Sequence, residues 1–416
     1  MSNPRIENER IKQAFYAKCR ENAKGKRVLA IQDTTEINHQ KHAGRLSQDD
    51  AELGPVGNNQ DVGFFLHPVL VVDEGTCFPV GLASIHDWNR DWDKIPKEER
   101  NYKKQAIEEK ESYRWISSAE QAKTVLEEAQ HITVIGDRES DIYEEWVEVP
   151  DARCDLLIRC SRNRRLHDRE ENLFEHLASR PSSGERTIEV GGNKKREKRQ
   201  AKVEIRYGRV KIARPLSRPD PRLPAYVEIH AIEIREKEES VPDGEEPILW
   251  RLLTTHEITD VEDAQTCARW YSYRWWIEEL FRVLKRQGLN VEDAQYESGL
   301  ALKRLTLMAM QAALQIMQLV AAREGNYEIA PEAVFEEDEL TYQERLLPHV
   351  EGKTSKQKNP YPRTNLAWSA WIIARLGGWK GSSGKGKLPG PITMKRGLEI
   401  FFQQYMGWQI AISSDP

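Results

Sequence analysis

The sequence contains little cysteine, and its cysteines are not grouped. Its 416 residues include five of them and no Cys-x-x-Cys pair: Cys19, Cys77, Cys154, Cys160 and Cys267. An odd number of scattered cysteines argues against a disulfide framework and against a zinc knuckle. The pairs His39–His42 and His86–Asp87 lack supporting ligands, so we expect no metal there. These absences indicate a protein of a reducing, cytoplasmic compartment.

The sequence also lacks a long uninterrupted hydrophobic run, a signal peptide and a strong charge of one sign. Its longest apolar stretch, about residues 305–322, is interrupted by Gln311, Gln315 and Gln318. We therefore expect a core or interface helix there and no membrane partner. The formal net charge is −5 and the pI about 6.1, so bulk composition does not indicate a nucleic-acid-binding protein. At this length the chain can bury one large core and at least one smaller one.

One stretch, residues 271–285, combines charge and periodicity as Y-x2-R-x3-E-x6-K. In a helix its polar members fall within a sector of about 80°; they are Tyr271, Arg274, Glu278, Arg282 and Lys285. One carboxylate among three cations and a phenol suits a metal-bound polyanion, because Glu278 can ligate a divalent cation while its neighbours hold phosphate oxygens. The alternative is a solvated helix face with i,i+4 ion pairs.

Two upstream segments each end a short apolar run with an aspartate. They are residues 27–33, which end in Asp33, and residues 132–137, which end in Asp137. Such runs are typical of buried strands, and open α/β sheets bind ligands at the carboxyl ends of their strands. A single aspartate in this position is more often a turn former or a helix N-cap. Two such strands, together with Glu278, favour a shared acidic site.

In these segments the chain resembles the bacterial cut-and-paste DDE transposases of the insertion-sequence group that bears a Tyr-Arg-Glu-Lys signature. The resemblance runs from about residue 25 to 410. The stretches that carry it are residues 33–35, 137–139 and 271–285, residues 109–112 with Trp115, residues 157–159, Trp250 with residues 252–254, and residues 373–378.

The resemblance implies a ribonuclease-H-like core in which Asp33, Asp137 and Glu278 are both catalytic residues and ligands of two Mg²⁺ or Mn²⁺ ions. Two ions about 3.5–4 Å apart serve an in-line phosphoryl displacement, in which water or a DNA 3′-hydroxyl attacks. The implied activity is DNA strand cleavage, hairpin formation and strand transfer. The implied partners are double-stranded transposon-end and target DNA and a second copy of the chain, in the bacterial cytosol at the nucleoid.

Further DNA contacts are expected outside the triad. The resemblance places Trp250 where the family receives a base flipped from the DNA end, and Arg159 where it contacts DNA. A tryptophan in a strand is usually a core residue, and a strand arginine is often paired to a carboxylate. A basic loop carries Lys194, Lys195 and Arg196, which either neutralise phosphates or are simply solvated. Tyr271, Arg274, Arg282 and Lys285 complete the expected DNA-binding set.

The predicted fold class is α/β: a ribonuclease-H-like mixed sheet with a β-rich insertion and a helical C-terminal region. Strands are expected at 27–33, 62–73, 77–85, 131–136 and 154–159, with helices near 113–129 and 140–147. We assign residues 1–24 to a helical lead-in, 25–160 and 265–330 to the catalytic core, 161–264 to the insertion and 331–416 to a C-terminal dimerisation region.

The two ends of the chain raise separate expectations. Only 32 residues precede Asp33, so the resemblance implies that most of the N-terminal domain that recognises transposon ends is missing. A helix at 392–408 carries an apolar stripe of Met394, Leu398, Phe401, Phe402 and Tyr405. The family pairs protomers through its C-terminal helix; alternatively, the stripe packs on its own chain. Two other functions remain open: an inhibitor that forms mixed dimers with a longer transposase, and a metal-dependent nuclease on the same fold.

Overall fold

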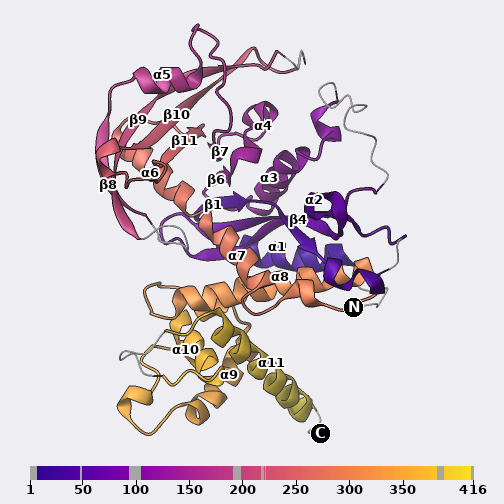
Figure 1. Ribbon diagram of the computed structural model, residues 1–416. Coiled ribbons are helices and arrows are strands. Elements are labelled where there is room, and N and C mark those ends of the chain that lie inside the picture. The colour runs from indigo at the N-terminus through magenta and orange to yellow at the C-terminus, as the bar shows by residue number, and fades with distance from the viewer. Residues whose placement is uncertain are drawn as a thin grey trace.

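The computed structural model describes residues 7–46, 49–92, 105–190, 198–216, 220, 222–381 and 388–413. Within these residues a large sheet forms the upper part of the molecule, and helices α9 to α11 form a separate layer below it (Figure 1). The helices are α1 (Asn8–Ala23), α2 (Gly57–Gln60), α3 (Tyr113–Val125), α4 (Tyr143–Glu148), α5 (Leu173–Ser179), α6 (Val261–Ser272), α7 (Trp275–Lys285), α8 (Gly299–Ala322), α9 (Glu337–Val350), α10 (Leu366–Leu376) and α11 (Pro391–Ser413).

Eleven strands in the described residues form one sheet. They are β1 (Arg27–Gln32), β2 (Thr35–Asn38), β3 (Gly54–Val56), β4 (Asp61–Asp73), β5 (Pro79–Trp88), β6 (His131–Gly136), β7 (Cys154–Arg159), β8 (Gly184–Val190), β9 (Arg199–Ala213), β10 (Tyr226–Glu236) and β11 (Leu249–Thr254). The predicted strands and the two predicted helices of the core are confirmed, whereas the short strands β2 and β3 were missed. Both pair with β4, so long-range pairing creates them rather than a local pattern.

The core of the sheet has the order β5-β4-β1-β6-β7. Strand β1 runs parallel to β6, and β6 runs parallel to β7, while β4 and β5 are antiparallel to their neighbours. This is the ribonuclease-H-like mixed sheet that we predicted, with the strands that precede the two aspartates side by side. Strands β1 and β6 are buried along almost their whole length, which explains their continuous apolar runs.

The β-rich segment between β7 and α6 continues the same sheet. Strand β11 pairs antiparallel with β7, where Leu252 faces Arg159, and strands β10, β9 and β8 follow in order. Hydrogen bonds therefore cross the boundary that we placed at residue 160. Helix α5 lies within this segment and packs on β9 and β10.

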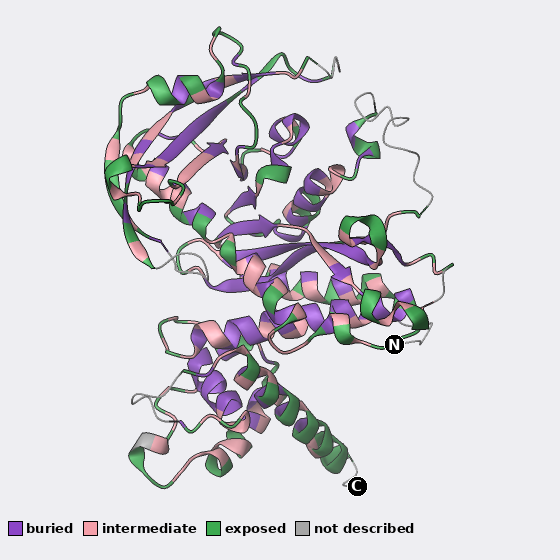
Figure 2. Cartoon of the chain, in the orientation of Figure 1, coloured by how far each residue is buried: buried purple, intermediate pink, exposed green. Residues whose placement is uncertain are grey.

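Helix α8 connects the sheet to the C-terminal helices. It packs against α7 and α1 on one side and α10 and α11 on the other. Among the described residues it is the one helix long and apolar enough to cross a membrane, and 61% of its most apolar window is buried inside the protein. A mostly buried helix of this kind is typical of a protein core, as its position in Figure 2 illustrates.

The helix predicted for residues 271–285 is divided. Helix α6 ends at Ser272 and α7 begins at Trp275. Tyr273 and Arg274 between them keep dihedral angles close to helical values, so the chain bends without leaving the helical region. Tyr271 therefore lies on a different helix from Glu278, and the single polar stripe that we drew is interrupted.

The apolar stripe of α11 packs on its own chain. Phe401 is fully buried, and its ring lies 5.9 Å from the rings of Phe335 and Tyr342. Met394 and Leu398 are also buried, at 0% and 6% exposure. The expectation that this stripe pairs two protomers is therefore wrong, because its apolar side chains already pack against Phe335, Tyr342 and α10 of the same chain.

Candidate active site

The two aspartates lie at the same edge of the sheet, directly after parallel strands. Asp33 follows β1, and its Oδ1 accepts a hydrogen bond from the backbone N–H of Thr34 at 2.8 Å. Asp137 follows β6, and its Oδ1 accepts from the backbone N–H of Glu139 at 2.8 Å, which caps a short 3₁₀ turn. Asp137 is thus an N-cap, as the alternative interpretation held. The other carboxylate oxygen of Asp137, Oδ2, takes no part in this hydrogen bond.

Arg274 connects the helix carboxylate to the sheet. Its Nη1 donates to Oδ2 of Asp33 at 2.8 Å, and its Nη2 forms an ion pair with Glu278 one turn further along. The bend between α6 and α7 places Arg274 at the point where it reaches both groups. The structure therefore brings Glu278 to the carboxyl ends of the strands, as the sequence pattern predicted.

The electrostatics of the site indicate an excess of negative charge. Burial raises the pKa of Asp33 to about 6, and the negative charges of Asp137 and Glu278 raise it further than the Arg274 guanidinium lowers it. Burial lowers the pKa of Arg274, but the carboxylates of Asp33 and Glu278 together raise it above its usual value. Three carboxylates with one arginine among them form a site that a further cation would neutralise.

The donor set fits a hard divalent cation. Asp33, Asp137 and Glu278 would hold it through carboxylate oxygens, the ligands that Mg²⁺ and Mn²⁺ prefer. The raised pKa of Asp33 reports a carboxylate whose charge is poorly compensated by the protein alone. A bound metal would relieve this cost, whereas the arginine relieves it only in part.

Three of the expected DNA-contacting residues meet beside Arg274. Tyr271 is buried, and burial raises the pKa of its hydroxyl while the charges of Arg274 and Arg159 oppose the increase. Arg159 hydrogen-bonds Tyr271, and burial is the main cause of its lowered pKa. The ring of Trp250 lies edge-on to Tyr271, with the centroids 5.8 Å apart. The paired-carboxylate alternative for Arg159 is not what the structure contains, because its neighbours are Tyr271 and the Leu249 carbonyl.

Trp250 is half-buried rather than a fully enclosed core residue. It lines a cavity of about 340 Å³ together with Ile188 and Val203 from the inserted strands and Gln265 and Arg269 from α6. An indole at the wall of such a cavity has one surface packed on the protein and another facing open volume.

The remaining predicted cations lie further along or outside the described chain. Arg282 is exposed and pairs with Glu279, and Lys285 lies 3.4 Å from Glu292. Neither contacts the three carboxylates. Lys194, Lys195 and Arg196 lie outside the described residues.

Sequence reasoning missed a buried polar network beneath the two aspartates. Glu145 accepts hydrogen bonds from Ser140 Oγ at 2.8 Å and from Gln32 Nε2 at 3.2 Å. His67 continues the network, with ring nitrogens 3.2 Å from Gln32 and 2.9 Å from Thr34. Burial raises the pKa of Glu145 well above its usual value. The network links the residue after one aspartate to the turn after the other.

Sequence reasoning also missed a cleft lined with arginines next to the carboxylates. Its volume is about 640 Å³, and the arginines that line it are Arg90, Arg114, Arg138, Arg162 and Arg164. Arg114 donates to Thr34 Oγ1 at 3.0 Å and pairs with Glu139 at 2.6 Å. Arg162 and Arg164 belong to one basic run in the sequence, residues 159–165, which could neutralise a phosphate backbone, whereas Arg90, Arg114 and Arg138 come from separate segments.

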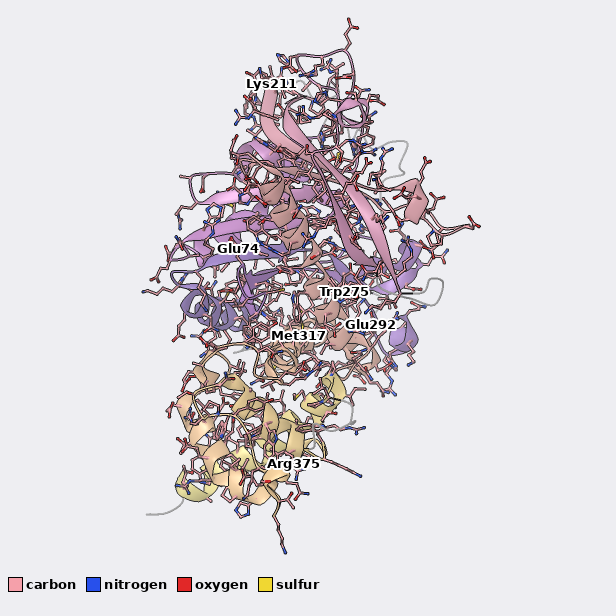
Figure 3. The ribbon with its side chains drawn as sticks, turned by 90° about the vertical axis from the view of Figure 1, so that its left-hand side faces the viewer. Glu74, Lys211, Trp275, Glu292, Met317 and Arg375 are labelled. Carbon is pink, nitrogen blue, oxygen red and sulfur yellow. The ribbon has the colours of Figure 1, made fainter. Side chains whose placement is uncertain are left out.

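An exposed tryptophan, Trp275, begins the helix that carries Glu278. Its side chain is 61% exposed, and Figure 3 labels it on the ribbon near Glu292. An aromatic residue in an amphipathic helix predicts core packing, which is why the sequence alone gave no reason to single it out.

Fold and site together define a ribonuclease-H-like α/β protein with a three-carboxylate centre suited to divalent metal. Residues 115–315 match the family described as the transposase DDE domain. This range contains Asp137 and Glu278. The matched range covers 201 of the 416 residues, and over this range the chain is similar to that family.

Among solved structures the chain is similar to piggyBac transposase in a synaptic complex with hairpin DNA. The TM-score is 0.36 and the sequence identity 9%, over 79% of this chain and 53% of that one. The chain thus spans about half the length of that protein.

Proposed function

We propose that this protein is a DDE transposase of the group with the Tyr-Arg-Glu-Lys signature, similar in type to the Tn-five transposase. It cleaves DNA strands at transposon ends, closes a hairpin and transfers the end to target DNA. The observation that carries this proposal is the convergence of Asp33, Asp137 and Glu278 from two parallel strands and one helix. Three separate segments bring their carboxylates to the same edge of the sheet, where Arg274 contacts both Asp33 and Glu278, which a solvated helix face does not require.

The chemistry follows from the charge distribution. Two bound Mg²⁺ or Mn²⁺ ions would activate the attacking oxygen and stabilise the leaving oxygen. The three carboxylates would hold these ions beside the reacting phosphate. No protein side chain needs to act as a nucleophile. Arg274, released from Asp33 and Glu278 when their charge is compensated, is positioned to hold a phosphate oxygen.

Trp250 is proposed to receive a base that leaves the duplex during hairpin formation. Its cavity of about 340 Å³ lies next to Tyr271, which in turn lies next to Arg274. Stacking of a flipped base on an indole recovers about 1–3 kcal/mol of the cost of unstacking. The exposed Trp275 offers a second aromatic surface on the catalytic helix.

Double-stranded DNA is the proposed partner, bound along the arginine-lined cleft and the cationic side of α7. The cleft supplies guanidinium groups near Asp137. Arg282 and Lys285 would exchange their partners Glu279 and Glu292 for phosphate oxygens. Lys194, Lys195 and Arg196 belong to the same proposal. Phosphate contacts of this kind supply most of the sequence-independent affinity for DNA.

A homodimer in the bacterial cytosol, at the nucleoid, is proposed as the working form. Since the buried stripe of α11 is already occupied, the surface for a second copy would be the outer face of that helix. Its exposed apolar residues are Ile392 at 51%, Ile400 at 36% and Met406 at 56%. The far end of α11 projects from the body and is exposed in Figure 2.

The test is alanine substitution of each triad member. Asp33→Ala, Asp137→Ala and Glu278→Ala should each reduce metal-dependent cleavage by at least about 10³-fold, because each removes a ligand that the others cannot replace. Cleavage is measured with Mg²⁺ and with Mn²⁺ on pre-nicked end DNA. Thermal melts without metal should show little change for Asp33→Ala and Glu278→Ala, because the lost like-charge repulsion offsets the lost contact with Arg274. Asp137→Ala also loses its N-cap hydrogen bond, which costs about 1 kcal/mol. Near-normal cleavage by any one variant would remove that residue from the triad.

The same assays separate the two alternative functions. A nuclease on this fold would cut DNA but never join the cut end to a target. A regulator would neither cut nor join, and would lower the transposition by a longer relative when the two are mixed. Glu279→Ala is the matched control, since Glu279 lies on the same helix and pairs only with Arg282 in the described structure.

A further inference from the structure

A second cluster of metal-ligating side chains lies at the opposite edge of the sheet. His131 begins β6, Asp155 is near the start of β7, and His256 follows the end of β11. The ligand atoms of these three residues all lie within 4.8 Å of one another. Because β6 starts at His131 and Asp137 follows its end, the two clusters are separated by roughly 20 Å, the length of a six-residue strand.

The distances match those between ligands of one tetrahedral ion. His131 Nε2 lies 3.0 Å from Asp155 Oδ2, and His256 Nδ1 lies 3.3 Å from the same oxygen. With metal–ligand bonds of about 2.0–2.2 Å, tetrahedral zinc ligands are about 3.3 Å apart. Two imidazole nitrogens and one carboxylate oxygen are also the donor types of zinc sites with three protein ligands and one open position.

Other atoms of these side chains make the surrounding hydrogen bonds, so the candidate ligand atoms face one another. Within the described part of the chain, His131 Nε2 is buried and has no hydrogen-bond partner, although Asp155 is close. The other ring nitrogen of His256, Nε2, lies 2.9 Å from Thr133 Oγ1. Thr255 Oγ1 donates to the other oxygen of Asp155 at 2.7 Å. Such outer partners orient ligands and fix the histidine tautomer in metal sites.

We propose that His131, Asp155 and His256 bind one Zn²⁺ ion through three protein ligands, with one position open. Imidazole nitrogen with a single carboxylate favours Zn²⁺ over the hard cations suited to the catalytic carboxylates. The ligand side chains are 13–22% exposed, so a metal in solution reaches them. The ion ties the starts of β6 and β7 to the segment that leads from β11 into α6, and hence towards Arg274 and Glu278. The negative charge of Glu74 acts on His256. Figure 3 labels Glu74 well apart from Glu292, and Glu292 lies beside the catalytic helix.

The experiment uses the full chain, stripped with a chelator and kept in excess Mg²⁺ to occupy the catalytic carboxylates. Zn²⁺ binding is counted by titration calorimetry, and Co²⁺ is added as a spectroscopic substitute. A tetrahedral Co²⁺ ion with histidine ligands absorbs strongly in the visible range, whereas an octahedral ion on carboxylates absorbs weakly. The wild type should bind one Zn²⁺ per chain, show the strong Co²⁺ band and melt at a higher temperature with Zn²⁺.

The variants decide between a metal site and a simple ion pair. His131→Gln with His256→Gln should lose the bound Zn²⁺, the Co²⁺ band and the Zn²⁺-dependent thermal shift. The matched control, His167→Gln with His349→Gln, removes two exposed histidines elsewhere and should keep all three. Thr133→Val keeps the side-chain shape and should weaken Zn²⁺ binding by about 10- to 100-fold.

Equal Zn²⁺ binding by the wild type and the double variant, or a wild type without the strong Co²⁺ band, would overturn the proposal. In that case the two histidines and the aspartate form an ion-pair cluster only. Neither result depends on cleavage activity, so the catalytic proposal stands or falls separately.

Discussion

At the scale of single residues, the candidate active site places several carboxylates close together in a partly buried position. Asp33 and Glu145 both have a pKa raised by burial, yet they serve different purposes. Asp33 faces two other carboxylates and can be compensated by metal. Glu145 is fully buried and accepts hydrogen bonds from both sides of the acidic edge. The two residues give separate predictions.

The first prediction concerns pH and the metal-free protein. Because the pKa of Asp33 is raised to about 6 on folding, its stabilising contribution is complete below the unfolded value near 4 and is lost as pH rises through about 6. The free energy of unfolding should therefore fall by about 1.4 kcal/mol between pH 5 and pH 7 from this group, out of a total of about 3 kcal/mol that is lost between about pH 3 and pH 7. Urea unfolding with a chelator at pH 5, 6, 7 and 8 measures this decrease.

Asp33→Asn is the comparison, because asparagine cannot ionise. Its stability profile should be flatter over this range, and it should exceed the wild type in stability at pH 7.5. Parallel profiles for the two proteins would mean that Asp33 has an ordinary pKa.

The second prediction concerns Glu145. Glu145→Gln keeps a neutral group that can still accept from Ser140, so we expect a change in the free energy of unfolding within about 1 kcal/mol. Glu145→Ala leaves buried partners unsatisfied and should cost about 2–4 kcal/mol. Cleavage should fall in the alanine variant and be largely retained in the glutamine variant. Loss of cleavage in both, with stability intact in the glutamine variant, would mean that the charged form is needed.

At the scale of elements, the junction between α6 and α7 matters most. Tyr271 at the end of α6 contacts Arg159 and Trp250, and Arg274 at the start of α7 reaches Asp33 after β1. Strand β11 contributes Trp250 to this meeting point because it pairs directly with β7. Hairpin formation is therefore expected to depend on β11, and first-strand nicking is not.

The third prediction tests that separation. Trp250→Ala should leave first-strand nicking unchanged and slow hairpin closure by about 10- to 100-fold, which corresponds to the stacking energy of one base. Trp250→Phe keeps an aromatic surface and should slow closure much less. Rates of nicked and hairpin products are resolved on denaturing gels. If nicking and closure fall together, or if Trp250→Ala unfolds the protein, then the residue is a core residue.

At the scale of the whole molecule, a sheet and a helical layer meet at α8 (Figure 1). Helix α11 starts against α10 and then extends away from the body. Its inner face stabilises the helical layer, and its outer face carries exposed apolar side chains. The two faces should respond differently to a charge.

The fourth prediction contrasts them. Ile400→Glu with Met406→Glu places charge on the outer face and should weaken self-association at least about tenfold while the melting temperature stays within a few degrees. Leu398→Glu with Phe401→Glu buries two carboxylates and should destabilise or unfold the helical layer. Light scattering and thermal melts measure the two effects. A wild type that stays monomeric at all concentrations, with and without end DNA, would contradict pairing through this face.

Short-range patterns in the sequence were sufficient to predict several strands and the three candidate carboxylates. Runs of buried apolar residues fixed β1, β6 and β7, and an aspartate after two of these strands, with the spacing of residues 271–285, identified the three carboxylates. These patterns are readable because strand alternation and helix periodicity involve neighbours within a few residues.

The contacts between segments that are distant in the sequence could be identified only from the folded structure. It joined the inserted strands to the core sheet, packed the stripe of α11 on its own chain, and placed Glu145 under the acidic edge. It also brought together His131, Asp155 and His256 from three strands' ends. No short-range pattern encodes these contacts, because the residues that meet are separated by tens of residues or by more than a hundred.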